Sequence, residues 1–222
     1  MKKHKDVRNE GLARYAPDLP EDLQESVDSG QLFTQLEVEC VEQLVRGVKL
    51  DAATINELRL ESCVLEQVAM PRSIISSAKW KDVRFSGCDF ANVEIRALTA
   101  VRVEFMGCRM TGLRLAETEW QSLLVSGGDQ RYAQFRFCSL RTSEFDNCDL
   151  QEADFYGADL RGCIFRRCNL RNVEMSKAKL VGADLRGSVV EGLRLGAEDI
   201  RGAIVDAAQA LTFAPRLGVK IS

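Results

Sequence analysis

A five-residue period governs most of this chain. In residues 148–172, CDLQEADFYGADLRGCIFRRCNLRN, each unit has a small residue, a polar residue, a large apolar residue and two further, mostly polar residues. A period of five matches neither the 3.6-residue turn of a helix nor the two-residue alternation of a strand. The backbone must therefore turn a corner in every unit.

The large position keeps one phase along the repeat. It falls at every residue number divisible by five from Leu50 to Ile200, and Ala100 and Gln130 are the departures from a large apolar residue. One inserted residue would move every later side chain to the wrong face, so no loop interrupts the repeat. Thirty-two units fit between Val48 and Ala207.

Like residues also recur every twenty positions. The small position carries Cys88, Cys108, Cys148 and Cys168, and the large position carries Phe85, Phe105, Phe145 and Phe165. Such ladders are expected where each coil of a solenoid stacks on the preceding coil. Four units then make one coil, and the sequence predicts about eight coils.

The pattern strongly resembles the pentapeptide-repeat family, whose repeat is commonly written A-(D/N)-L-x-x. The resemblance implies an all-β solenoid, a right-handed quadrilateral β-helix. The prediction has four parts: a tail in residues 1–32 with a short helix near 20–29, an irregular first coil or cap in 33–47, the β-helix in 48–207, and a helix and strand cap in 208–222. No ordered structure is expected for residues 1–15.

The C-terminal segment has the sequence of a helical cap. Asp206 and Gln209 have the spacing of a capping box, and Pro215 is expected to end the helix near Ala214. The predicted helix presents one apolar stripe to the last coil, made of Ala207, Ala210, Leu211 and Ala214. Gyrase-interacting members of the family commonly dimerise through this end. The resemblance therefore implies a candidate homodimer surface at Phe213, Leu217, Val219 and Ile221, and a monomer is the alternative.

Nothing in the sequence predicts catalysis, a cofactor or a metal ion. The only histidine is His4, which removes the usual Ser-His and Cys-His nucleophile pairs. Seven of the eight cysteines occupy the small position and no CxxC pair occurs, so we interpret them as reduced, buried, small apolar residues. The chain is not expected to be an enzyme.

Departures from the repeat indicate where the surface differs. Gly128 and Gln130 break the pattern in the fifth coil, and Glu198 breaks it near the end. Close to the first departure, Tyr132, Phe137 and Tyr156 fall at outward positions near one corner. Grouped exposed aromatic residues can form an interaction surface. The alternative is that these three are scattered surface aromatics and that Gln130 finds a water or backbone partner.

Two functions fit the resemblance. Some relatives modulate DNA gyrase with an acidic, duplex-like rod, but Val48 to Gly202 here contains 22 Lys and Arg against 22 Asp and Glu. This balance favours the other function, a rigid interaction or scaffold protein with a protein partner that the sequence does not identify. Direct nucleic-acid binding is not expected. The absence of a signal-like or membrane-spanning apolar run predicts a cytoplasmic protein.

Overall fold

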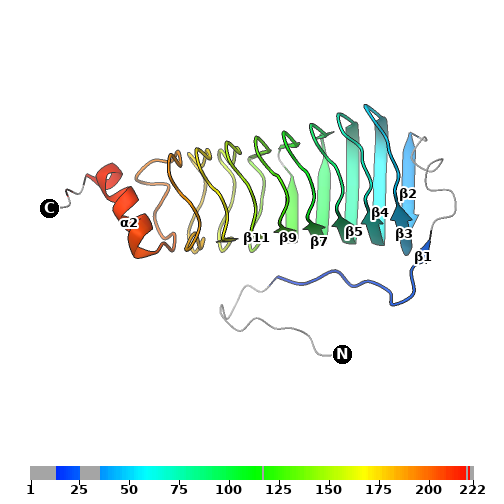
Figure 1. Cartoon of the computed structure of the whole chain (residues 1–222), viewed down its shortest axis with the longest axis horizontal. Helices are drawn as coiled ribbons and strands as arrows, with labels where there is room; N and C mark the ends of the chain where they lie inside the picture. The colour runs from blue at the N-terminus through cyan, green and yellow to red at the C-terminus, as the bar shows by residue number, and fades with distance from the viewer. Residues whose placement is uncertain (1–13, 26–35, 117, 219, 221–222) are drawn as a thin grey trace.

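The computed structural model describes residues 14–25, 36–116, 118–218 and 220. It is a rod of stacked coils with a helix at one end and an N-terminal segment running beside it (Figure 1). Residues 20 positions apart lie on adjacent coils: Phe145 pairs in parallel with Val125 on one side and with Phe165 on the other. The predicted β-solenoid is confirmed, and it makes about seven turns.

The strands are longer near the N-terminus than near the C-terminus. One sheet follows the rod in the order β1-β3-β4-β5-β7-β9-β11-β12, and we call the side that it covers from β3 onward the long-sheet side. After β12 the coils are joined by isolated parallel bridges such as Asn169↔Val189. The strands are β1 (Gln24–Glu25), β2 (Glu37–Val41), β3 (Gln43–Arg46), β4 (Thr54–Glu66), β5 (Ile74–Ser86), β6 (Glu94–Ile95), β7 (Leu98–Met106), β8 (Arg114–Ala116), β9 (Glu119–Ser126), β10 (Gln134–Arg136), β11 (Glu144–Asp146) and β12 (Ile164–Arg166).

Most corners are made by one residue in the left-handed conformation. These residues recur two positions after the large residue, as at Gly162 (φ 69°) and Arg167 (φ 55°). The left-handed conformation costs a residue with a side chain about 1–2 kcal/mol. Hydrogen bonds between coils hold the backbone in this conformation. For example, the backbone N–H of Asn147 donates to the carbonyl oxygen of Arg166 (2.8 Å).

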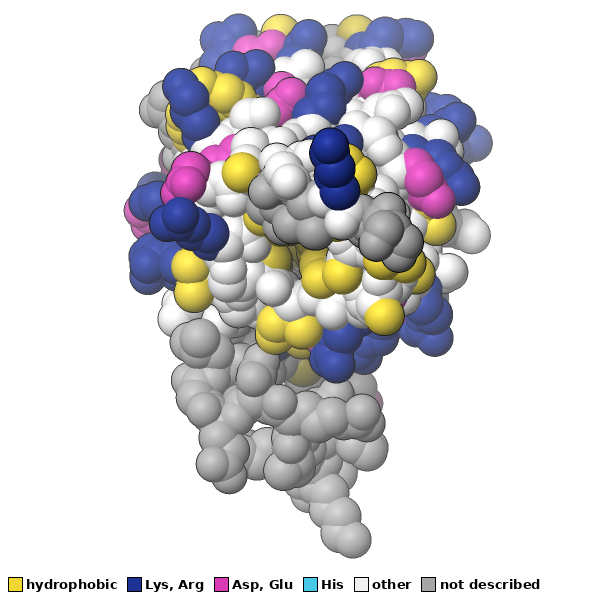
Figure 2. Space-filling model, turned by 90° about the vertical axis from the view of Figure 1, so that its left-hand side faces the viewer, with side chains coloured by type: hydrophobic (Ala, Val, Ile, Leu, Met, Phe, Trp, Pro, Cys, Tyr) yellow, Lys and Arg dark blue, Asp and Glu magenta, His cyan; other side chains and the backbone are white. Residues whose placement is uncertain are grey.

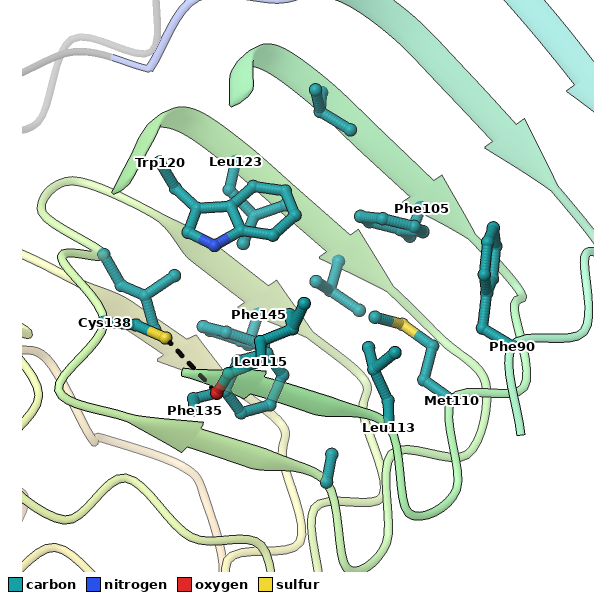
Figure 3. Packing of buried hydrophobic residues seen from close by; sticks show 14 of the residues in the cluster. Phe90, Phe105, Met110, Leu113, Leu115, Trp120, Leu123, Phe135, Cys138 and Phe145 are labelled. Carbon is teal, nitrogen blue, oxygen red and sulfur yellow. Dashed lines mark hydrogen bonds between the residues drawn. The ribbon is translucent and has the colours of Figure 1, made fainter. Parts of the chain in front are cut away.

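The large and small positions fill a continuous core (Figure 3). The ring centroids of Phe85 and Phe105 are 4.9 Å apart and those of Phe145 and Phe165 are 5.1 Å apart, both stacked as the twenty-residue ladder predicts. On another side, Trp80 and Trp120 lie two coils apart with centroids 6.2 Å from each other. Ala100 lies between them in the register, and its small side chain leaves room for both indoles.

At the departure from the repeat, Gln130 fills an inward position with a polar side chain that forms hydrogen bonds inside the core. Gln130 is fully buried, and its Nε2 donates to the carbonyl oxygens of Gly127 (2.9 Å) and Cys108 (3.3 Å). A Cβ at Gly128 would lie 2.0 Å from the Cys108 carbonyl oxygen, so only glycine fits there. The amide nitrogen thus has backbone partners, whereas the buried Oε1 has none among the described residues, and the coil continues without a break in register. Glu198, the other departure, is exposed and forms an ion pair with Arg201.

The N-terminal segment differs from the prediction. Instead of a helix near 20–29, Gln24–Glu25 form β1, which pairs in parallel with β3, and residues 26–29 lie outside the described part. The open end of a solenoid exposes an unpaired strand edge, and β1 pairs with backbone groups of β3 that this end would leave unpaired. Arg14 and Tyr15, for which no order was expected, are placed beside the rod.

The C-terminal cap has the predicted start but a different orientation. Helix α2 (Ala207–Phe213) begins with the Asp206–Gln209 capping box, and the 3₁₀ helix η1 (Ala214–Leu217) follows with Pro215 near its start. Gln209 and Phe213 face the last coil and are buried, whereas Ala207, Ala210 and Leu211 are exposed. The predicted apolar stripe is therefore wrong. The reason is hydrogen bonding: the Nε2 of Gln209 donates to the carbonyl oxygen of Ser188 (2.7 Å) and to that of Leu185 (2.6 Å), which also accepts from the backbone N–H of Ser188.

Candidate interaction surfaces

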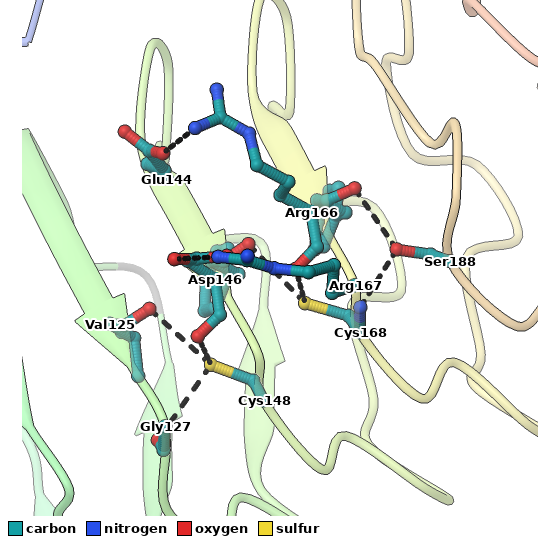
Figure 4. Close-up of polar contacts among 11 residues, drawn as sticks. Val125, Gly127, Glu144, Asp146, Cys148, Arg166, Arg167, Cys168 and Ser188 are labelled. Atoms are coloured by element: carbon teal, nitrogen blue, oxygen red, sulfur yellow. Dashed lines mark hydrogen bonds and ion pairs between the residues drawn. The ribbon is translucent and has the colours of Figure 1, made fainter.

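The cysteines are placed in the core. All eight are buried thiols. Burial raises the pKa of Cys40 to about 12 and also raises that of Cys63. The neighbouring Cys168 thiol and burial together raise the pKa of Cys148. A thiol is nucleophilic only when it ionises, so the raised pKa suppresses the reactivity of these three thiols. Figure 4 shows the Cys148 and Cys168 thiols directed at backbone carbonyl groups.

The described residues contain no group of three His, Cys, Asp or Glu side chains that could hold a metal ion. Within the same residues, no helix has the length and apolar character needed to cross a membrane.

Most carboxylates of the rod form ion pairs with a lysine or an arginine. Between Val48 and Gly202, every acidic residue that the structure describes, except Glu119 and Asp199, lies within 4.0 Å of a Lys or Arg nitrogen. Many pairs lie on one side of one coil, as where Arg161 and Arg186 contact Asp159 and Asp184 two residues earlier. Several carboxylates also accept from a backbone N–H two residues later, as Asp154 does from Tyr156 (2.8 Å). The surface thus presents paired charges rather than a row of free acids.

One corner of the rod carries an aromatic pair, the exposed Phe137 and the half-buried Tyr156. We call this the aromatic corner: Phe137 and Tyr156 with Arg136, Gly157 and Lys177. The rings of Phe137 and Tyr156 meet edge to face, with centroids 5.5 Å apart. The Tyr156 ring also contacts two cations, the Arg136 guanidinium carbon at 5.0 Å and the Lys177 nitrogen at 5.3 Å from its centroid. Contact with Tyr156 raises the pKa of Lys177. The corner therefore combines aromatic rings with an arginine and a lysine held by cation–π contacts.

Phe137 lies at a corner of its coil. It is 52% exposed and has a φ of 57°, the left-handed conformation that most corners of the rod share. One coil later the equivalent residue is Gly157, and a Cβ there would lie 2.6 Å from the Phe137 ring. The missing side chain of Gly157 is what lets the ring lie flat against the next coil.

The three aromatic residues predicted to cluster do so only in part. Tyr132 is 58% exposed and left-handed (φ 60°) like Phe137, but it occupies the preceding corner, at the other edge of the same side. Phe137 and Tyr156 touch, whereas Tyr132 stands apart from the aromatic corner. The sequence placed all three outward; the separation follows from the five-residue spacing of the corners.

The candidate dimer surface at the C-terminus needs a correction. Phe213 was expected to point partly away from its own coil, but it is 3% exposed and belongs to the core. The Leu217 side chain, Val219 and Ile221 lie outside the described part. Among the described residues, the large apolar side chains exposed near this end are instead Val181, Ile204 and Leu211. Figure 2 looks onto this end, where hydrophobic and basic side chains are interspersed.

A groove lies between α2 and the last coil. It is lined by Ala197, Glu198, Ile200, Arg201, Ala203, Val205, Ala210 and Phe213. It is open to solvent and mostly apolar, and it adjoins the exposed Leu211.

These features define a solenoid repeat protein whose side chains serve packing and surface contacts. Two family models match the chain, one described as pentapeptide repeat region over residues 78–155 and one described as pentapeptide repeats (8 copies) over residues 154–192. The chain belongs to the pentapeptide-repeat family. None of the curated proteins matches it.

Solved structures of two proteins are among those similar to the chain. A trypsin-treated variant of QnrB1, a plasmid-mediated fluoroquinolone resistance protein, is 19% identical, and the match covers 90% of this chain and 96% of that one with a TM-score of 0.43. Full-length QnrB1 is 17% identical over 79% of this chain and 100% of that one, with a TM-score of 0.38. HetL, involved in heterocyst differentiation regulation in the cyanobacterium Nostoc sp. strain PCC 7120, is 17% identical over 77% and 89%, with a TM-score of 0.33.

Proposed function

We propose that this protein is a non-enzymatic, rigid interaction module that binds a protein partner through the aromatic corner. The observation that carries the proposal is the contact between the half-exposed Phe137 ring and the Tyr156 ring, which two cations also contact. Exposed apolar side chains that are grouped, rather than scattered singly, mark interaction surfaces.

The chemistry of the corner suits a protein surface. Aromatic residues and arginine are enriched at the centres of protein interfaces, where a few such residues supply most of the binding free energy. The Phe137–Tyr156 pair is already held edge to face, and the Arg136 side chain is fixed by an ion pair with Asp154 (3.1 Å). Little conformational entropy remains to be lost when a partner binds. The rod supplies the rigidity.

The proposal is tested by capture from cell lysate with crosslinking, using the full chain immobilised as wild type, Phe137→Asn and Val181→Asn. Asparagine tolerates the left-handed conformation, so Phe137→Asn removes the ring without a backbone penalty. Val181 is 61% exposed and serves as the matched apolar control. A protein captured by the wild type and by Val181→Asn, but lost with Phe137→Asn, supports the proposal. Identical capture by all three variants contradicts it.

Modulation of DNA gyrase is the second candidate, and it rests on the family alone. Imitation of DNA needs a row of unpaired negative charges, and the ion pairs of the rod weigh against it. A supercoiling assay with purified gyrase, with and without a quinolone, separates the two. We expect no effect of the protein on supercoiling or on inhibition by the drug. A clear effect would make gyrase the partner.

A further inference from the structure

Residues 14–25, which we call the strap, run lengthwise beside the rod (Figure 1). They contact two carboxylates of the strands β5 and β7. Glu104 and Asp82 occupy outward positions of the coil, yet they are only 5% and 3% exposed. Nη1 of Arg14 lies 2.9 Å from Oε1 of Glu104, and the backbone N–H of Asp18 donates to Oδ1 of Asp82 (2.8 Å). The strap is the element that contacts both acids.

The equivalent carboxylate is more exposed to solvent where the strap lies farther from it. Two coils further on, the Glu144 side chain retains 21% exposure against 6% for Glu104, and Arg14 reaches it only at 4.0 Å. The strap then ends in β1, which adds a parallel strand to the free edge of β3. A single segment thus contributes an arginine to an acidic pocket, a backbone donor to a second acid and a short strand to a sheet edge.

Few contacts hold the strap against the rod. Within the described residues, two residue pairs join β1 to β3, Gln24↔Gln43 and Glu25↔Leu44. Pro17 and Pro20 have no N–H, so they cannot donate to a sheet. Tyr15 is 68% exposed, and none of the described strap residues belongs to the core cluster. Ion pairs and one sheet edge hold the strap, and the ion pairs weaken with salt.

Removal of the strap leaves no buried charge without a partner. Oε2 of Glu104 accepts from Nε of Arg84 (2.9 Å), and Asp82 is paired with Arg102. Burial alone would raise the pKa of Asp82, but the hydrogen bonds from Arg102 and from the Asp18 amide outweigh it, so its pKa is lowered. Once the strap leaves, water can replace Arg14 and the Asp18 amide while both ion pairs within the rod remain.

We propose that the strap masks a docking surface for an extended, arginine-bearing segment of a partner protein, which binds in its place. The ligand chemistry is read from the strap itself: one arginine for Glu104 and Glu144, a free backbone N–H for Asp82, and a strand that pairs with the edge of β3. The strap competes from within the chain at the high effective concentration of a tethered ligand. A partner binds only to the fraction of molecules whose strap is released. This surface is separate from the aromatic corner, and the proposal does not depend on the function assigned to that corner.

The test measures the binding of a fluorescein-labelled peptide of residues 14–25 to the full chain by fluorescence anisotropy. Arg14→Ala in the full chain loosens the strap, and we expect it to tighten binding of the peptide about tenfold relative to the wild type. Arg59→Ala removes an exposed arginine that pairs with Glu39 and Glu57, and it is expected to leave the affinity unchanged. The peptide whose arginine is replaced by alanine, and the double variant Arg14→Ala, Glu104→Gln with the parent peptide, should each lose at least about tenfold.

Thermal melting checks that each variant is folded; the three substituted residues, Arg14, Arg59 and Glu104, lie outside the hydrophobic core. Equal affinity of the wild type and Arg14→Ala for the peptide overturns the proposal, and so does absence of binding to either. Binding that survives loss of the peptide's arginine also overturns it. A wild-type dimer in light scattering that becomes monomeric in Arg14→Ala would show that straps exchange between two copies, which overturns the assignment to a different partner.

Discussion

The thiol of Cys168 donates a hydrogen bond to the carbonyl oxygen of Phe145, 3.3 Å away on the preceding coil. The thiols of Cys148 and Cys88 make the same contact with the carbonyl groups 23 residues earlier, at 3.3 and 3.4 Å. Ser188 repeats the relation with its hydroxyl group, which donates to the Phe165 carbonyl (3.0 Å). At these rungs the small position therefore holds a hydrogen-bond donor as well as a small side chain.

The donor predicts an unusual order of tolerance at Cys168. If burial alone mattered, alanine would replace cysteine better than serine, because serine is more polar. Since Ser188 already makes the equivalent bond one coil later, we expect Cys168→Ser to retain it and Cys168→Ala to be destabilised by about 1–2 kcal/mol, more than the serine variant. Urea denaturation of both variants measures the difference. A more stable alanine variant would contradict a role for the thiol as a donor.

Cys40 predicts a loss of stability in alkali. Burial raises its pKa in the folded protein from 9.0 to about 12. Between these values the unfolded thiol releases its proton while the folded thiol keeps it, so its contribution to stability is complete below pH 9 and falls as the pH rises toward 12. The slope approaches about 1.4 kcal/mol per pH unit. Urea unfolding at pH 7.5, 9 and 10.5 should show the wild type losing its advantage over Cys40→Ala; parallel pH profiles would refute the assignment.

Gln209 should matter more to the C-terminal cap than the larger apolar Leu211. Its side-chain amide serves two carbonyl groups of the last coil, whereas Leu211 is 58% exposed. We expect Gln209→Leu to lower stability by about 2 kcal/mol, because both carbonyl groups lose a donor, and Leu211→Ala to change it by about 0.5 kcal/mol or less. Thermal melts of the two variants decide. The opposite order would restore the apolar stripe as the contact with the rod.

The rod was predictable from the sequence because its constraint is local and repeated. A residue such as Phe145 lies inward because of its place in a five-residue unit, and its neighbours Val125 and Phe165 follow from the twenty-residue coil. The same reasoning placed Phe137 and Tyr156 outward. The spacing does not predict that their rings touch, or that the Phe137 ring occupies the space beside Gly157.

The two ends were less predictable because their contacts do not follow from the five-residue repeat. Each end of the solenoid leaves backbone groups without a neighbouring coil. At the C-terminus, Gln209 donates to the carbonyl groups of Leu185 and Ser188, and this contact sets the rotation of α2 against the expectation from its apolar residues. At the N-terminus, β1 meets the edge of β3, and Arg14 reaches Glu104, a contact 90 residues distant in sequence. No periodic signal marks such pairs.

The register itself can be tested with two adjacent residues. Phe145 is fully buried between two coils, whereas Asp146 is on the surface and pairs with Arg167 (2.6 Å). We expect Phe145→Ala to cost about 3–5 kcal/mol, and Asp146→Ala about 0.5 kcal/mol because the ion pair is exposed. Equal shifts of the melting temperature would contradict the assignment of inward and outward positions.

The contact between Gly157 and Phe137 predicts a measurable coupling at the aromatic corner. Gly157 and Gly107 are both left-handed, with φ of 68° and 61°, but a Cβ at Gly157 meets the Phe137 ring at 2.6 Å and a Cβ at Gly107 meets nothing within 4 Å. Gly107→Ala should therefore report the backbone cost alone, about 1–2 kcal/mol, and Gly157→Ala should cost about 1–3 kcal/mol more. In a Phe137→Ala background the excess at Gly157 should vanish, because the clashing ring is gone. Chemical denaturation of the four variants and the wild type completes the cycle. An excess that persists without the ring would mean that Gly157 is required for a reason other than the placement of Phe137.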